Sequence, residues 1–410
     1  MTLRPRTATR RRAALGALAA LAILGGLAAG IVAAMAGPSP AATGGPSQVA
    51  VGSERPGASP SVLAPSPSTL VTSTPPSSPT PSATAAPGST LVRAPLTGRL
   101  VAPDVALRHP IAVMIDDLSP ARPQSGFSAA SIVYQAPAEG GIPRYMMVFQ
   151  ENIPTDVGPV RSSRYYYIAW AAELRAIYAH AGGSPQALAT LRKQGQGQLV
   201  FNADEFRWAR SFHRISTRFS PHNLYTTGKA LRALVRATGA KDAKITWPWT
   251  FAPDQPIEKR PVGGRIQVTY LANAIRYDYD RLSNSYLRSN TTEKKQIDAS
   301  TKRRVAPKNV IVMLMHFGPL NDGHPQKHRL EGQVIGSGPA WISTNGVTIK
   351  GTWKKTALTS ATRFLDARGR PVALTVGQTF VQVMPYGSKM SFVPGKRVPP
   401  PPEPIGHVPF

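Results

Sequence analysis

Residues 111–117 read Ile-Ala-Val-Met-Ile-Asp-Asp, five apolar residues followed by two aspartates. A short apolar run preceded by Pro110 predicts a buried strand. Two further strands are predicted at Ser131–Gln135 and Tyr145–Gln150. Helices are predicted after them, at Arg164–Arg175, Gln186–Gln194 and Gly228–Thr238. This order of strands and helices is typical of a three-layer α/β domain with a mixed sheet, which we place over residues 96–250.

Two of these helices have clear end signals in the sequence. Ser184 suits the N-cap position of the second helix and Pro185 its first helical position, while Gly195 suits the position after its end. Thr227 is the expected N-cap of the third helix, and Gly239 is its expected stop.

Beyond Pro261 the sequence pattern changes to strands alone. They are predicted at Arg265–Tyr270, Ile275–Tyr279, Val310–His316, Ala340–Thr344, Val347–Trp353 and Thr379–Met384. Asn345-Gly346 joins two of them and is a strong signal for a type I′ hairpin turn. We therefore expect a β-rich α+β domain over 262–392, followed by a proline-rich tail over 393–410.

The N-terminus predicts a membrane anchor. Residues 1–12 contain five arginines, and Ala13–Ala36 carries no charge. As a helix this run is about 36 Å long, enough to cross a hydrocarbon core, and the arginines favour a cytoplasmic N-terminus. We expect a single-pass cell-membrane protein whose globular part is extracytoplasmic. The alternative is a secreted protein, cleaved near Ala36 at a small-residue site.

Residues 37–95 are expected to form a disordered linker. Thirteen prolines and twelve serines lie between residues 38 and 95, with almost no charge and no apolar periodicity. Such a segment cannot bury enough apolar surface to offset its ordering entropy. An extended tether of this kind suits a domain that is carried through a cell wall.

Composition excludes several kinds of chemistry. The chain has no cysteine, which rules out disulfides, thiolate metal sites, a cysteine nucleophile and a lipoprotein-type lipid anchor. The net charge is +27, and a field of that sign attracts polyanions. No helix-turn-helix, zinc-finger or RNP pattern is present, so we expect no nucleic acid and favour anionic cell-wall polymers or lipid-linked ligands.

Four arginines are the predicted ligand-binding side chains. Arg122, Arg144, Arg161 and Arg164 lie beside strand ends or glycine turns, where guanidinium groups can grip phosphate or carboxylate with two hydrogen bonds. Gly182, Gly183 and Ser184 open a helix whose backbone N–H groups suit an anion. The alternative for each arginine is a structural ion pair with a nearby carboxylate.

The catalytic candidates are Asp116, Glu139 and His222. Asp116 and Asp117 end a strand, and together they are weak candidates for holding Mg²⁺. Glu139 is either a general base or the ion-pair partner of Arg144. His222 lies in the loop Ser220-Pro221-His222-Asn223, where it is either a site residue or a donor of loop hydrogen bonds.

The motifs ARPQSG (121–126), GPVRSSR (158–164), HAGGSP (180–185) and SPHNLY (220–225), in this order, resemble the YerB-like family of bacterial envelope proteins. That resemblance spans about residues 96–390 and implies two domains of unestablished function. The chain departs from the usual family pattern at Asp116-Asp117, Ser131, Gln135 and Pro143. Members of the family are often lipoproteins, whereas this chain offers a membrane helix instead.

A more distant similarity concerns mechanism. The order of a strand-end aspartate and arginines resembles the LytR-CpsA-Psr phosphotransferases, in which arginines grip a polyprenyl pyrophosphate. The match would fall on Asp116, Arg122 and Arg161, although the next aspartate of that family is Ser162 here. We expect a protein that binds an anionic envelope ligand. The alternatives are an envelope phosphotransferase and a non-enzymatic scaffold, and the oligomeric state stays open.

Overall fold

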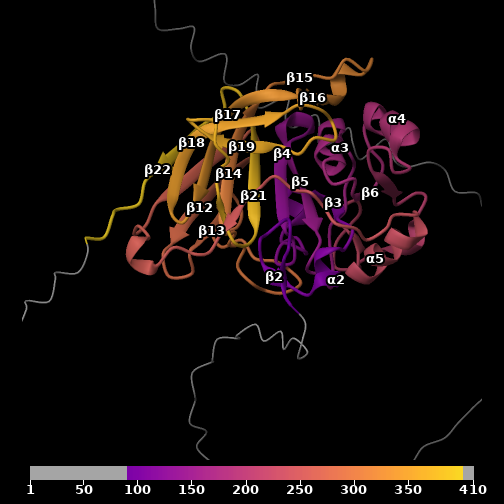
Figure 1. The fold of residues 1–410 in the computed structure, drawn as a ribbon. Helices are drawn as coiled ribbons and strands as arrows, with labels where there is room; N and C mark the ends of the chain where they lie inside the picture. Colours follow the sequence, from indigo (N-terminus) through magenta and orange to yellow (C-terminus); the bar gives the residue numbers. More distant parts are fainter. Residues whose placement is uncertain (1–89, 400–410) are drawn as a thin grey trace, which may run out of the picture. The chain divides into compact units, whose positions relative to one another are not determined.

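The computed structural model describes residues 90–399 (Figure 1). The predicted cytoplasmic segment 1–12, the predicted anchor 13–36 and most of the predicted linker lie outside the described residues. Within residues 90–399, no helix combines the length and the hydropathy that a membrane crossing requires.

The apolar run at 111–117 forms strand β3 (Ile111–Asp116), and all six of its residues are buried. It lies between β5 (Pro143–Phe149), which is antiparallel to it, and β6 (Ile177–His180), which is parallel. The other two strands of this region are β4 (Ile132–Pro137) and β7 (Phe201–Asp204). The predicted mixed sheet is therefore confirmed.

Strands from the C-terminal half complete the same sheet. They are β14 (Asn309–Met315), β17 (Gly336–Thr344), β18 (Val347–Lys355), β19 (Arg363–Asp366) and β21 (Thr379–Pro385). The full order is β19-β18-β17-β14-β21-β4-β5-β3-β6-β7. The junction is the parallel pairing of β21 with β4, and Figure 1 shows these two strands side by side. The two segments that the sequence separates as domains thus share one ten-stranded sheet.

Alternate residues of the buried strands pack against two different layers. Ala112 and Met114 of β3 belong to the core that includes α3 (Tyr165–Ala172) and α4 (Pro185–Gln194). Ile111, Val113 and Ile115 belong to the core on the other face, together with α5 (Gly228–Ala237). The period-two alternation of a strand thus fills both cores from one apolar run.

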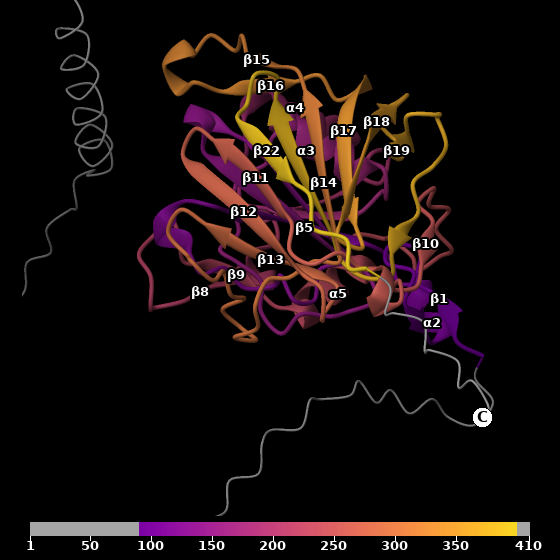
Figure 2. The ribbon, with the colours of Figure 1, turned by 90° about the vertical axis from the view of Figure 1, so that its left-hand side faces the viewer.

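A second sheet shares that other face with α5. Its strands run in the order β13 (Ser285–Asn290), β12 (Asn273–Asp280), β11 (Arg265–Tyr270) and β22 (Met390–Val393), and they can be followed in Figure 2. Inward residues of β11 and β12, such as Ile266 and Tyr277, lie in the same core as Val113.

The predicted end signals operate as expected. Ser184 Oγ accepts a hydrogen bond from Ala187 N at 3.3 Å, and Thr227 Oγ1 accepts one from Ala230 N at 3.2 Å. In the β17–β18 hairpin, Asn345 and Gly346 have φ of 50° and 74°, as a type I′ turn requires. The first helix is shorter than predicted, because the chain leaves the helix after Ala172 and Arg175 takes a left-handed φ of 48°.

The other helix and strands of the described region are short. They are β1 (Val92–Arg93), β2 (Leu100–Val101), α2 (Pro103–Ala106), β8 (Phe212–Arg214), β9 (Leu224–Thr226), β10 (Phe251–Ala252), β15 (Phe317–Pro319), β16 (Leu330–Gly332) and β20 (Leu374–Thr375). β1 pairs with β2, so Val92 and Arg93, which precede the predicted boundary at Leu96, belong to a sheet.

Candidate anion-binding site

One edge of the large sheet gathers most of the predicted site residues. Because β4, β3, β6 and β7 are mutually parallel and β5 opposes them, their C-terminal ends meet the start of β5. Asp116 is the last residue of β3, and Arg144 lies directly opposite it in the register of β5. The carboxyl edge of strands in such a sheet is where ligand-facing groups gather.

Asp116 joins an arginine and a histidine from two other segments. Its Oδ2 lies 2.8 Å from Nδ1 of His222 and 3.1 Å from Nε of Arg161. The contact with Arg161 is an ion pair without hydrogen-bond geometry. Asp116 Oδ1 accepts a hydrogen bond from Leu118 N at 3.1 Å. The backbone fixes the arginine as well, because Arg161 N donates to Met114 O of β3 at 2.9 Å.

The ionised form of Asp116 is favoured by these contacts. Burial alone would raise the pKa of this carboxyl, whose residue is only 2% exposed. The hydrogen bond from His222 and the charge of Arg161 outweigh burial and hold the pKa of Asp116 below its ordinary value. Asp116 is therefore a fixed negative charge at the sheet edge.

Glu139 joins the other two arginines of this edge. Its Oε1 pairs with Nη2 of Arg164, and its Oε2 lies 3.4 Å from Nη2 of Arg144. Arg144 also donates from Nη1 to Ser162 O at 2.7 Å, and Arg164 donates from Nη1 to Ser163 O. Glu139 thus supplies compensating negative charge for Arg144 of β5 and for Arg164, whose cation at the start of α3 opposes the helix dipole.

Tyrosines of α3 hold the turn that carries these groups. Tyr167 Oη donates to Arg144 O at 2.5 Å, and Tyr166 Oη donates to Pro137 O at 2.6 Å. Both rings are buried. The end of β4 and the start of β5 are therefore fastened to the helix that follows Arg164.

Positive charge exceeds negative charge in this group. Three guanidinium groups, those of Arg144, Arg161 and Arg164, share the two carboxylates of Asp116 and Glu139. Burial, together with the charge of Arg144, lowers the pKa of Arg164 to about 10. The same two causes lower the pKa of Arg161, although Asp116 opposes them. Nε of Arg164 is buried without a hydrogen-bond partner among residues 90–399.

The glycine turn lies next to the arginines but has already used most of its donors. Ser163 N donates to Gly182 O at 2.9 Å, and Ser184 N donates to Ser163 O at 3.2 Å. Gly182 N donates to Asp204 Oδ1 at 3.0 Å. The turn therefore positions the Ser163 segment, and two of its three backbone N–H groups are taken within the protein.

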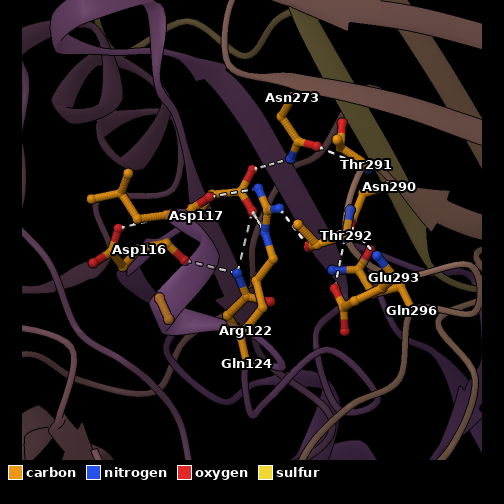
Figure 3. A network of polar contacts seen from close by, with 12 residues as sticks. Asp116, Asp117, Arg122, Gln124, Asn273, Asn290, Thr291, Thr292, Glu293 and Gln296 are labelled. Atoms are coloured by element: carbon orange, nitrogen blue, oxygen red, sulfur yellow. Dashed lines mark hydrogen bonds and ion pairs between the residues drawn. The ribbon is translucent and has the colours of Figure 1, made fainter. Parts of the chain in front are cut away.

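Arg122 and Asp117 belong to a different network, shown in Figure 3. Arg122 Nε donates to Asp117 Oδ1 at 3.0 Å, and its Nη1 donates to Thr292 Oγ1 at 2.8 Å. Asp117 Oδ2 accepts from Gln135 Nε2 at 2.7 Å and from Asn273 Nδ2 at 3.0 Å. Burial raises the pKa of Asp117 despite the charge of Arg122 and the hydrogen bonds that the carboxylate accepts. The structure thus separates Arg122 from the other three arginines.

Arg288 is the main residue of this network that the sequence did not single out. It is fully buried and donates from Nη2 to Gln135 Oε1 at 2.6 Å and from Nε to Tyr277 Oη at 2.9 Å. Its guanidinium carbon lies 5.4 Å from the centre of the Tyr145 ring. No strand is predicted from the sequence over Ser285–Asn290, so the sequence carries no signal for a buried arginine there.

The two adjacent aspartates do not share a site. The carboxylate of Asp116 meets His222 and Arg161, whereas that of Asp117 meets Arg122 and Asn273. Over the described part of the chain, no group of three or more histidines or acidic residues has the geometry to hold a metal ion.

Known proteins are similar to this chain over both halves. Residues 96–241 match the family described as "Protein of unknown function (DUF3048) N-terminal domain", and residues 266–381 match the C-terminal domain of that family. The Bacillus subtilis (strain 168) protein named "Putative lipoprotein YerB" is 30% identical over an alignment of 322 residues, and the match covers 75% of this chain and 90% of the relative.

A solved structure supports the same relationship. The crystal structure of YerB from Bacillus subtilis is similar with a TM-score of 0.64 and 26% identity, over 73% of this chain and 99% of that one. Sequence motifs, two family domains and a common fold agree, and the chain belongs to the YerB-like family of proteins of unknown function.

Proposed function

We propose that this protein is an extracytoplasmic envelope protein that binds an anionic ligand through Arg144, Arg161 and Arg164, which we name the arginine cluster. The lipoprotein name of the Bacillus subtilis relative supports an envelope location. The excess of positive charge over the whole chain supports an anionic partner.

The observation that carries this proposal is the shortage of negative charge around the arginine cluster. Among residues 90–399, the three guanidinium groups form ion pairs with Asp116 and Glu139 alone, and the charge of Arg144 helps to depress the pKa of both Arg161 and Arg164. A bound phosphate or carboxylate would supply the missing charge. It would also accept hydrogen bonds from guanidinium groups that are held by the fold before binding.

The arginines of the cluster differ in their exposure to solvent. The side chain of Arg161 is 21% exposed, whereas that of Arg164 is 7% exposed. We infer that a ligand meets Arg161 first and that Arg164 acts from behind it as a buried charge. His222, which also contacts Asp116, borders the same approach.

The test is thermal unfolding of the parent and of Arg161→Ala with pyrophosphate, a polyprenyl phosphate or teichoic-acid fragments. A bound anion stabilises the folded state by mass action, so the parent melts at a higher temperature with the correct anion. Removing one charge-assisted contact of about 1.5–3 kcal/mol should weaken binding at least about tenfold. Equal responses of the parent and the variant to every anion would refute the proposal.

A matched control is Arg370→Ala. Arg370 pairs with Asp366 and its side chain is 66% exposed, so its loss changes the net charge by the same amount at an ordinary surface position. A general effect of charge would weaken anion binding equally in both variants. The proposal requires the effect to be confined to Arg161→Ala.

We also propose that residues 13–36 anchor the chain in the membrane with the globular part outside. The support is the run of arginines before an uncharged apolar stretch. Protease added to intact, wall-stripped cells should cut between Pro38 and Pro95 and release the globular part. Cleavage of this segment only after lysis would contradict the topology, and release without protease would favour cleavage near Ala36.

The 2.8 Å contact between Asp116 and His222 favours a second candidate, an envelope phosphotransferase. An aspartate bound to Nδ1 orients an imidazole so that Nε2 can take the proton of an attacking hydroxyl. As that oxygen bonds to phosphorus, the bond to the polyprenyl phosphate breaks and this leaving group departs. His222→Gln should abolish transfer from a pyrophosphate-linked substrate while anion binding persists. Equal rates of transfer by the parent and by His222→Gln would exclude the phosphotransferase role of His222.

A further inference from the structure

The most exposed apolar side chains of the described region gather around the arginine cluster. Four large apolar residues between 90 and 399 exceed three-quarters exposure: Phe219 at 93%, Leu271 at 87%, Phe206 at 78% and Leu282 at 77%. Single exposed apolar residues need no explanation. Three of these four, however, adjoin the loops that hold the cluster.

Each of the three has a specific contact with that edge. A Cβ atom placed on Gly182 would lie 3.3 Å from the ring of Phe206, so Phe206 covers the glycine turn. A Cβ on Gly141 would lie 2.6 Å from Leu271, so Leu271 covers the turn after Glu139. Phe219 lies in the same loop as His222, and the backbone N–H of His222 donates to Phe219 O at 2.9 Å.

The strand order places Leu271 and Phe206 apart along this edge. Leu271 adjoins the β4–β5 turn, and Phe206 follows the end of β7. The strands β5, β3 and β6 lie between β4 and β7, which makes four strand spacings, or roughly 19 Å at the usual strand spacing. The arginine cluster lies between, on β5 and on the segment beside β3.

More positive charge accompanies the two phenylalanines. The segment from 204 to 223 contains Arg207, Arg210, Arg214 and Arg218 against Asp204 and Glu205. Arg218 fastens its loop by donating to Ala121 O and Pro123 O, so Phe219 is presented from a held backbone. Exposed aromatic side chains between arginines are the composition that enters the interface of an anionic bilayer.

We propose that this edge docks on the surface of a bilayer that contains anionic phospholipid, with Phe206, Phe219 and Leu271 inserted between the lipid headgroups and the arginines paired with phosphates. This inference rests on the proposed function, because it takes the anionic ligand to be a lipid headgroup. Charge complementarity selects the bilayer over a second copy of this basic chain, which would repel it.

The absence of cysteine from the sequence allows a clean experiment on the full chain. Single variants Phe206→Cys and Phe219→Cys are labelled with an environment-sensitive fluorophore and reconstituted in phosphatidylcholine vesicles, with or without phosphatidylglycerol. Leu282→Cys is the matched control. It is as exposed as Phe206 but lies in the β12–β13 turn, at the opposite end of its sheet from Leu271.

Docking predicts emission at shorter wavelength from labels 206 and 219 only when phosphatidylglycerol is present, with reversal at high salt. The label at 282 should not respond. Adding Arg161→Ala should reduce the apparent affinity about fivefold, the effect of one basic residue near an anionic surface. No shift at 206 and 219, equal shifts at 282, or shifts without lipid that grow with protein concentration would each overturn the proposal.

Thermal stabilisation by soluble pyrophosphate shows whether a negative result contradicts the bilayer inference or the proposed function. If pyrophosphate stabilises the protein while the labels do not shift, the bilayer inference is wrong and the anion site remains. If the labels shift but neither pyrophosphate nor Arg161→Ala has an effect, the arginine cluster is not the anion site. Docking through this cluster is then also refuted.

Discussion

Oδ2 of Asp116 lies 2.8 Å from Nδ1 of His222, although 106 residues separate them in the chain. The same oxygen lies 3.1 Å from Nε of Arg161. A buried carboxylate thus holds one imidazole ring and one guanidinium group at the edge of the sheet. Because both partners are partly exposed, whatever binds at this edge meets groups whose positions Asp116 has already set.

Asp116→Asn should destabilise the protein and unsettle this edge. The amide keeps the shape of the side chain but removes the charge that compensates Arg161. Breaking a largely buried pair costs about 3–5 kcal/mol, which urea unfolding would detect. Asp366→Asn is the control, since its partner Arg370 is exposed and such surface pairs contribute little to stability. Equal losses in both variants would contradict the structural role of Asp116.

Acid should weaken the fold partly through Asp116 and Glu139. The pKa of each is held below its ordinary value, so each carboxylate contributes stability above the unfolded-state pKa of about 4. That contribution is lost as the pH falls from there toward the folded-state pKa. The free energy of unfolding, measured by urea between about pH 6 and 3, should therefore fall less steeply in Asp116→Asn and Glu139→Gln. Parallel curves for parent and variants would contradict this assignment.

The sequence predicted local features better than distant ones. Residues that are close together in the chain determine the apolar run of β3, the caps of α4 and α5 and the Asn345-Gly346 turn. All of these features formed as expected. The pairing of β21 with β4 has no such local signal, because a parallel partner can lie anywhere in the chain. For that reason the sequence separated segments that share a sheet.

The same contrast between local and distant features holds for the candidate site. Residue type and strand ends identified Asp116, Glu139 and the arginines, and the structure brings Arg144, Arg161 and Arg164 to one edge. Nothing in residue type distinguished Arg122 from them. Its direction depends on Asp117, the first residue after β3, whose carboxylate pairs with Arg122 while that of Asp116 contacts Arg161 and His222.

The two family domains should unfold in a single transition. Without the C-terminal half, β4 loses its pairing with β21, and the buried Gln135 and Asp117 lose Arg288 and Asn273. A fragment of residues 96–250 should therefore lack cooperative unfolding in circular dichroism, whereas one of residues 90–399 should show a single transition. Independent folding of the shorter fragment would contradict this expectation.

Arg288→Met offers a finer test of that junction. Methionine is an apolar side chain of similar length, but it leaves the acceptors Gln135 Oε1 and Gln296 Oε1 without the donor that Arg288 provides. Each buried acceptor that loses its partner costs about 1–3 kcal/mol. The m-value should stay that of the whole unit, because both halves still unfold together. Two separate transitions in this variant would show that the halves are independent.

Arg122→Ala and Arg161→Ala should have opposite consequences, although the sequence placed both arginines in one site. Arg122 is the ion-pair partner of the buried Asp117. Its loss removes that charge while Gln135 and Asn273 still donate to the carboxylate, and it should cost up to about 3–5 kcal/mol, to be measured by urea unfolding. Pyrophosphate should still stabilise this variant, since the arginine cluster is intact. Arg161 is partly exposed and shares Asp116 with His222, so its loss should cost less stability but remove most of the anion response. If Arg122→Ala instead abolishes the anion response while keeping its stability, the ligand binds at Asp117 and not at the arginine cluster.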